Sequence, residues 1–169
     1  MLITDARLIE AQHRALKARF DMMLARGTVA RVDDRSLQHL DVRLMADERP
    51  TRVEHFQQYG YTARPHEGAE VLVAHIGGNR DHAAVVAIDD RRYRLRSLAG
   101  GEVALYDDQG QKVVLGRSGV QVETSRAVTI KAAQSIIIEA GTITLKGNVH
   151  VDGDMTQTGA HTDANGVHA

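Results

Sequence analysis

Two histidines near the end of this chain are its best candidates for chemistry. His161 and His168 are seven residues apart, and neutral imidazole is a good ligand for zinc, iron or nickel. In an assembly with a threefold axis, one histidine close to that axis would supply three ligands. The pair is therefore a candidate site for one transition-metal ion. The alternative is that residues 161–169 form a turn that hydrogen bonds alone hold in place.

Pairs of aspartates are the next candidates, because two carboxyl groups act together in glycoside hydrolysis. Such pairs occur at residues 89–90 and 107–108, but neighbouring residues of a strand point to opposite faces. Both pairs are interpreted as solvated turn residues. The Asp-Gly-Asp sequence at 152–154 resembles the start of a calcium-binding loop but lacks the later ligands. It too is interpreted as a turn.

Composition and motifs exclude several classes of protein. The sequence contains no Gly-x-Ser-x-Gly elbow, His-Glu-x-x-His motif, P-loop or dinucleotide fingerprint. The absence of cysteine excludes disulfides and cysteine-ligated zinc. With 21 basic and 22 acidic side chains, the net charge is -1, which argues against neutralisation of nucleic-acid phosphates. We therefore expect neither an enzyme nor a nucleic-acid-binding protein.

The apolar stretches are too short for a membrane span, which needs about 18–20 apolar residues. The first residues contain acidic side chains and lack the apolar core of a signal peptide. The sequence therefore predicts a protein that is made and folded in a cytoplasm.

The elements that would position the candidate residues begin with a helix over residues 5–26. Thr4 is expected to cap its N-terminus and Gly27 its C-terminus. The residues that recur at helical spacing are Leu8, Ala11, Ala15, Ala18, Met22 and Ala25. Residues 1–26 are thus predicted to form an N-terminal helical segment.

Residues 27–98 change to a period of two, which is typical of strands. Strands are predicted at residues 28–32, 40–44, 71–76 and 83–88. The Gly-Gly-Asn-Arg sequence at 77–80 predicts a turn. Residues 92–96 are interpreted as a further strand with one solvated face. Several short strands in so short a segment predict a small barrel of the OB-fold type.

A repeat of apolar pairs, with members two residues apart, begins at Val113 and predicts short strands with one apolar face. The pairs are Val113/Leu115, Val120/Val122, Val128/Ile130, Ile136/Ile138, Ile143/Leu145 and Val149/Val151, with a weaker Met155/Gln157. Successive pairs start 7, 8, 8, 7, 6 and 6 residues apart. The apolar residues of this repeat do not follow the spacings of three and four that are typical of a coiled coil. The period of the repeat is also too irregular for a β-helix that a single chain builds from hexapeptides.

Two apolar side chains per strand cannot bury themselves in an isolated chain, but three chains wound about one axis would bury them. The absence of aromatic residues after Tyr106 suits so narrow an interior. Residues 99–160 are therefore predicted to form a triple-stranded, intertwined β-helix in a homotrimer. The six Val, Ile and Leu pairs, from Val113 to Val151, would line its axis, and residues 161–169 would form its tip.

Three segments resemble a known family. They are GGEVALYDDQG at residues 100–110, HEGAE at 66–70, and the stretch from GGNRDH at 77–82 to VVAI at 85–88. Together with the order of helix, barrel and repeat, they are similar to the Mu-type baseplate assembly protein V family, the central spikes of contractile-tailed phages. The resemblance covers nearly the whole chain.

The resemblance implies a trimeric spike in the tail baseplate of the virion, attached through its barrel to the hub protein. The β-helix would point towards the host and pierce its outer membrane during contraction. In the family, three copies of a His-x-His motif hold one iron ion at the tip. This chain departs from that motif, since its end contains His161 and His168, seven residues apart, and no His-x-His. The alternative functions are an OB-fold binding module and a β-helix enzyme acting on envelope polysaccharide.

Overall fold

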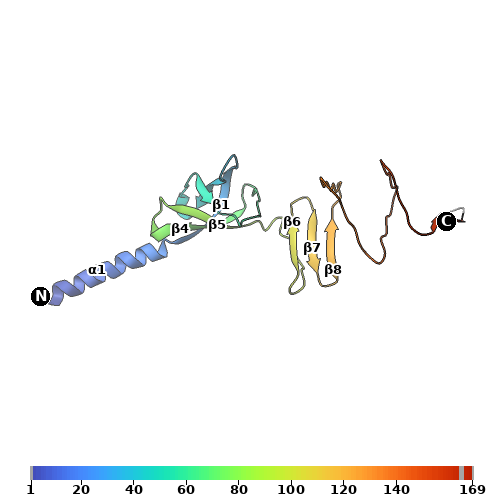
Figure 1. The fold of residues 1–169 in the computed structure, drawn as a ribbon. Helices are drawn as coiled ribbons and strands as arrows, with labels where there is room; N and C mark the ends of the chain where they lie inside the picture. Colours follow the sequence, from blue (N-terminus) through green and yellow to red (C-terminus); the bar gives the residue numbers. More distant parts are fainter. Residues whose placement is uncertain (1, 164–165, 169) are drawn as a thin grey trace. The chain divides into compact units, whose positions relative to one another are not determined.

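The computed structural model describes residues 2–163 and 166–168 of the chain (Figure 1). The chain divides into two compact units, Met1–Ala127 and Val128–Ala169. The first unit contains a helix, a closed five-stranded barrel and a three-stranded sheet. The second unit ends in a short hairpin. The fold is mainly β with an N-terminal helix, as the sequence predicts.

The N-terminal helix α1 (Leu2–Asp21) ends at Asp21 rather than at residue 26, and Thr4 lies inside it instead of capping it. The reason is that β1 (Leu24–Asp33) pairs with β4 from its first residue. Gly27, expected as the helix C-cap, lies inside β1, where a Cβ would collide with the carbonyl oxygen of Arg43. Barrel pairing therefore overrides the helical spacing of residues 22–26.

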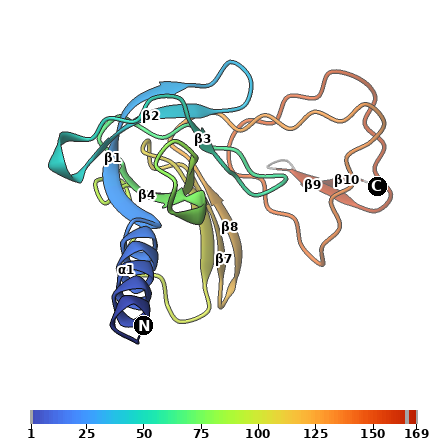
Figure 2. The ribbon, with the colours of Figure 1, turned by 90° about the vertical axis from the view of Figure 1, so that its left-hand side faces the viewer.

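The barrel closes in the order β1-β2-β3-β5-β4. Its other strands are β2 (His39–Leu44), β3 (Val53–His55), β4 (Glu70–His75) and β5 (Ala83–Asp89). Neighbours pair antiparallel except β3 and β5, which are parallel. In Figure 2, β1 continues from α1 and curves around the barrel. This closed barrel is consistent with the predicted OB-fold.

The barrel core is aliphatic. Its buried members are Val29, Leu40, Val42, Leu44, Val53, Ala69, Val71, Val73 and Val85. Two short 3₁₀-helices, η1 (Met45–Asp47) and η2 (Ile76–Gly78), connect the strands. The Gly-Gly turn predicted from the sequence coincides with η2, and Gly78 there has φ +70°. A Cβ at Gly78 would lie 2.5 Å from the carbonyl oxygen of Arg19, so this glycine permits the end of α1 to contact the barrel.

The strand predicted at residues 92–96 is wrong, because residues 91–93 form a turn. The Asp90 carboxylate accepts hydrogen bonds from the backbone N–H of Arg92 and from its guanidinium, at 3.1 and 2.6–2.8 Å. The backbone N–H groups of Tyr93 and Arg94 donate to the Asp90 carbonyl oxygen. The side-chain hydrogen bond from Arg92 holds the pKa of Asp90 below its usual value. A local Asx turn therefore replaces the predicted strand.

After the barrel, three strands form an antiparallel sheet in the order β6-β7-β8. They are β6 (Val103–Tyr106), β7 (Lys112–Gly116) and β8 (Gly119–Glu123). The turn between β6 and β7 confirms the interpretation of Asp107, whose carboxylate accepts hydrogen bonds from the backbone N–H groups of Gln109 and Gln111. Burial raises the pKa of Asp107, but these hydrogen bonds outweigh it and the pKa lies below its usual value.

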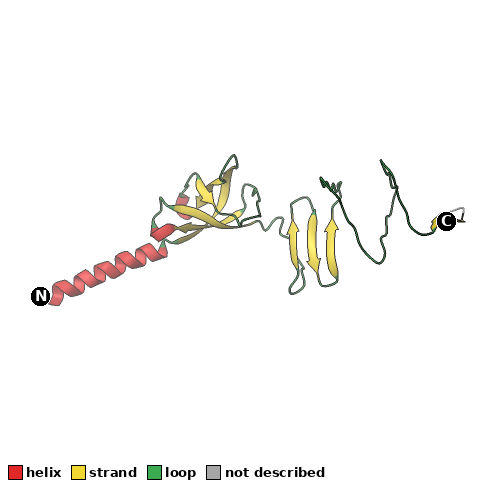
Figure 3. Ribbon diagram, viewed as in Figure 1, coloured by secondary structure: helices red, strands yellow, loops and turns green. Residues whose placement is uncertain are grey.

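Most of the second unit lacks regular secondary structure, unlike the first unit. Residues 128–160 form loop segments with no helix or strand, separated by bends at 133–134, 141, 147, 153 and 159 (Figure 3). Every residue from 125 to 160 is exposed, and these described residues pair with no strand of the chain. The hairpin of β9 (His161–Asp163) and β10 (Gly166–His168) follows. The triple-stranded β-helix predicted over residues 99–160 involves three chains, so it stays a prediction.

Candidate assembly surface

The β6–β8 sheet has one face made entirely of aliphatic side chains. Strand register places Val103 opposite Leu115, and Leu115 opposite Val120. The second row consists of Leu105, Val113 and Val122, which are paired in the same way. Because residues directly opposite one another project from the same face, the six side chains form one patch. We call Val103, Leu105, Val113, Leu115, Val120 and Val122 the apolar sheet face.

The apolar sheet face is uncovered in the single chain. Val120 is 68% exposed and Val122 64%, and Val103, Leu105 and Leu115 are also more than half exposed. The opposite face includes an ion pair between Lys112 and Glu123, at 2.9 Å. The sheet is therefore two-sided, with an ionic face and an apolar face, as expected of a sheet that packs against another surface.

Four members of the apolar sheet face were predicted as axis residues, whereas Val103 and Leu105 were not. Both lie in the GEVALYDDQG segment, and they are spaced two residues apart like the pairs that follow. That spacing was a sufficient signal for including them. The cross-strand register extends the row of predicted pairs towards the barrel by one pair.

The other predicted axis residues lie in the second unit, and a single chain does not bring them together. They are exposed, each by half or more: Val128, Ile130, Ile136, Ile138, Ile143, Leu145, Val149 and Val151. The bends between them include Gly147, Gly153 and Gly159, six residues apart and each with positive φ. These glycines allow the chain to reverse after each short stretch. The assignment of these residues to a trimer axis stays a prediction.

The carboxylate of Glu102 stabilises the start of the sheet through hydrogen bonds. Glu102 accepts hydrogen bonds from the backbone N–H of Ala99 (2.9 Å) and from that of Arg117 (3.1 Å) in the turn between β7 and β8. The hydrogen bond from Ala99 contributes most to a pKa of Glu102 below its usual value, and the one from Arg117 adds to it. Glu102 therefore fixes the position of β6 relative to the β7–β8 turn while it is ionised.

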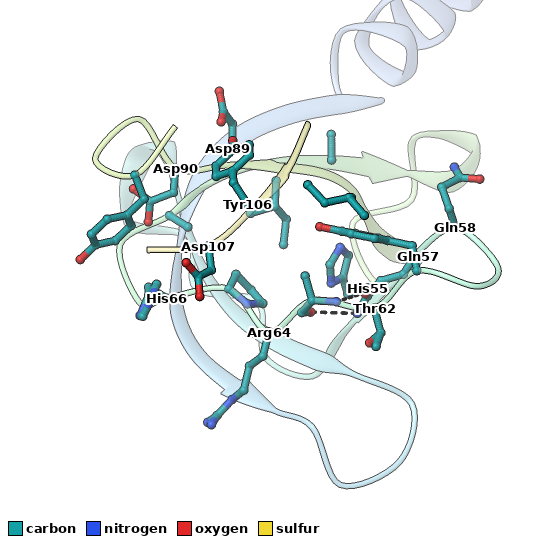
Figure 4. Close-up of a pocket in the computed structure, with 18 of the residues that line it drawn as sticks. His55, Gln57, Gln58, Thr62, Arg64, His66, Asp89, Asp90, Tyr106 and Asp107 are labelled. Carbon is teal, nitrogen blue, oxygen red and sulfur yellow. Dashed lines mark hydrogen bonds between the residues drawn. The ribbon is translucent and has the colours of Figure 1, made fainter. Parts of the chain in front are cut away.

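A cleft of about 900 Å³ lies between the barrel, the loop of residues 56–66 and β6 (Figure 4). The chain has two phenylalanines and four tyrosines, and four of these six rings line the cleft: Phe56, Tyr61, Tyr93 and Tyr106. The concentration of aromatic rings is the feature of this cleft that the sequence did not predict.

The polar side chains of the cleft form hydrogen bonds and contacts with other residues that line it. Gln57 accepts a hydrogen bond from the backbone N–H of Ala63 (2.6 Å) and donates one to its carbonyl oxygen (3.1 Å). His66 lies 3.3 Å from the Asp108 carboxylate, and its ring lies 5.1 Å from that of Tyr93. Of the adjacent aspartate pairs, Asp90 and Asp107 are occupied by turn hydrogen bonds. These two carboxylates therefore stabilise turns in the wall of the cleft, whereas Asp89, predicted as a turn residue, is the last residue of β5.

The two candidate metal ligands lie opposite one another in the terminal hairpin. β9 and β10 pair antiparallel, with His161 directly opposite His168. The structure describes the backbone of both residues but not their side chains. In the described part of the chain, no cluster of three histidine, aspartate or glutamate side chains could hold a metal ion. The side chains of His161 and His168 lie outside the part of the chain that was described, so the metal site at the tip stays a prediction.

The sequence of this chain is similar to those of known proteins. Residues 26–92 match the family described as Bacteriophage Mu Gp45, N-terminal. The baseplate puncturing device gp45 of Escherichia phage Mu is 35% identical over 137 residues, which cover 80% of this chain and 70% of that protein. The chain belongs to the Mu Gp45 family. This membership confirms the resemblance noted in the sequence, and it confirms that the protein is located in the tail baseplate of the virion.

A second member of the Mu Gp45 family comes from a bacterial genome. The Mu-like prophage FluMu protein gp45 of Haemophilus influenzae is 32% identical over 150 residues, which cover 85% of this chain and 82% of that protein. Each alignment covers at least 80% of this chain. Among the described helices, none is both long and apolar enough to cross a membrane.

Proposed function

We propose that this member of the Mu Gp45 family is a homotrimeric central spike that attaches to the baseplate hub and pierces the host outer membrane. The observation that carries the proposal is the exposure of the aliphatic pairs from Val103 to Val151, among which Val113 alone is half-buried. Fully burying one such side chain is worth about 1.5–3 kcal/mol, so a single chain forgoes a large stabilisation at these positions.

The backbone of the second unit supports the same conclusion. Residues 128–160 have no strand partner within the chain, and their backbone N–H and C=O groups would need partners once apolar cover buries them. Copies of the same chain would supply both the missing hydrogen bonds and the missing apolar cover. Three strands around one axis give a narrow prism whose interior has room for Val, Ile and Leu but not for aromatic rings.

The relative named a puncturing device supports a mechanical role rather than catalysis. A rigid needle concentrates the force of tail contraction on a small area of membrane, and this role needs stiffness rather than a reactive group. The OB-like barrel is the part available for attachment to the hub, because the repeat is committed to the needle. We therefore propose that the chain is not an enzyme.

The mass of the purified protein in solution tests the proposal. Size-exclusion chromatography with light scattering should give about 55 kDa, three times the 18.5 kDa of one chain. A trimeric mass together with a narrow rod in electron micrographs agrees with the spike. A monomeric mass would instead favour the OB-fold binding module and overturn the proposal.

The tip is proposed to hold one transition-metal ion through His161 and His168 of the three chains. The cross-strand register supports this choice, since it puts both histidines in the same layer of the hairpin. Imidazole suits iron, zinc or nickel, and the ion would tie together chain ends that otherwise fray. In such a site these residues bind the metal as neutral imidazole and position the two strands.

Elemental analysis of the trimer tests the metal site. We expect about one metal ion per three chains, lost in His161→Ala and in His168→Ala, and weaker binding below about pH 6.5, where free imidazole becomes protonated. His150→Ala is the matched control, because His150 precedes the hairpin and lies between Val149 and Val151. Trimer purified without chelator and free of stoichiometric metal would refute the site and leave a hydrogen-bonded hairpin as the tip.

A further inference from the structure

The helix α1 has an uncovered stripe with the spacing of a coiled coil. Ala6, Ile9, His13, Leu16 and Phe20 follow one another at intervals of 3, 4, 3 and 4 residues. This alternation places all five on one side of an α-helix, at the a and d positions of a heptad repeat. We call these five residues the α1 stripe. It differs from the alanine-rich series that begins at Leu8.

The barrel does not cover the α1 stripe. All residues from 6 to 21 are exposed, including Ile9 at 52%, Leu16 at 66% and Phe20 at 73%. The contact between α1 and the barrel lies at the end of the helix, where Arg19 meets Gly78. Helices in proteins owe most of their stability to packing of an apolar face. The α1 stripe therefore needs a partner outside its own chain.

We propose that the α1 helices of the copies in the spike pack against one another along this stripe as a parallel coiled coil. The proposal rests on the trimer proposed above, because assembly of the repeat would hold three identical helices at high local concentration. Heptad spacing is self-complementary in that arrangement, since each copy presents the same a and d residues to the axis. Other copies of this chain are thus the partner that the stripe fits.

His13 gives the coiled coil its register. It occupies an a position between Ile9 and Leu16, among apolar neighbours on the stripe. A single polar residue at such a position favours the alignment that brings its copies to the same level and disfavours shifted pairings. The helices would then be parallel and in register, which is also what a threefold axis through the repeat requires.

Cysteine scanning tests the inference directly, because the chain has no cysteine of its own. In a parallel, in-register coiled coil, Leu16→Cys places its three thiols next to the axis. Mild oxidation should then join about two thirds of the chains into covalent dimers, since a disulfide uses two of three thiols at close range. Arg14→Cys is the matched control, because Arg14 lies on the polar side of α1 and should give almost no covalent dimer.

The outcomes separate this inference from the proposed trimer. Light scattering on each reduced variant reports the trimer, and the denaturing gel after oxidation reports the contact between helices. Trimeric Leu16→Cys that stays monomeric on the gel would overturn the α1 contact while leaving the spike intact. Efficient cross-linking of Ala15→Cys but not of Leu16→Cys would also overturn it, because the alanine-rich face would then be the contact. A monomeric protein in all samples would refute the trimer itself.

A second variant measures the packing without oxidation. Leu16→Asp puts a charge on the stripe and should lower the helical circular dichroism signal at 222 nm, because α1 supplies the one long helix among the described residues. The exposed Arg14→Asp should retain that signal. Equal signals in the two variants would mean that copies of α1 do not stabilise one another through this stripe.

Discussion

Aspartate at position 138 is expected to abolish the trimer, whereas aspartate at position 137 is expected to preserve it. Ile136 and Ile138 form one of the predicted axis pairs, and Ile137 lies between them in a segment that would be a strand of the proposed β-helix. Alternate residues of an extended chain point to opposite sides. The substitution in Ile138→Asp would therefore enclose three carboxylates near one axis, each costing several kcal/mol unless neutralised.

The neighbouring substitution is a stringent control because it changes the same residue type to the same charge. Ile137 is 83% exposed, more than Ile136 or Ile138, and in the trimer its side chain would face solvent. Size-exclusion chromatography with light scattering, applied to both variants after identical purification, gives the answer. An intact trimer for Ile138→Asp, or loss of the trimer in Ile137→Asp alone, would show that the axis assignment is wrong.

The barrel was predictable because its pattern and its packing are contained in one chain. The alternation at 28–32 and 40–44 and the apolar runs at 71–76 and 83–88 coincide with β1, β2, β4 and β5, whose alternate residues fill the core. The errors lie where tertiary contacts compete with a local pattern. Residues 22–26 fit a helix by spacing, yet pairing with β4 makes Leu24 to Arg26 part of β1.

For the apolar sheet face, the sequence predicted which side chains lie together but not what covers them. The spacing of two identified which side chains share a face, and the register of β6, β7 and β8 bears this out for Val113, Leu115, Val120 and Val122. The partner of that face cannot be predicted from one chain, because in the proposed trimer the contacts that bury it would come from other copies. The proposed metal site is harder still to predict, since His161 and His168 of several chains would have to meet to form it.

The unheated trimer is expected to survive detergent and to run at trimer mass on a denaturing gel. In the proposed β-helix each strand pairs with strands of other copies, so no sheet edge is free to start unfolding. Three wound chains must also separate together before any one of them can expose its apolar pairs. The barrier to dissociation is therefore high, and the assembly is kinetically stable.

Heating and one variant make this expectation specific. Heating before electrophoresis should convert the trimer band to the 18.5 kDa monomer. Ile137→Asp should keep the detergent-resistant band without heating, because its charge would lie outside the prism. A monomer band from unheated wild-type protein that is trimeric by light scattering would mean that the chains associate side by side. Such a trimer would lack the interwound strands on which the stiffness of a piercing needle depends.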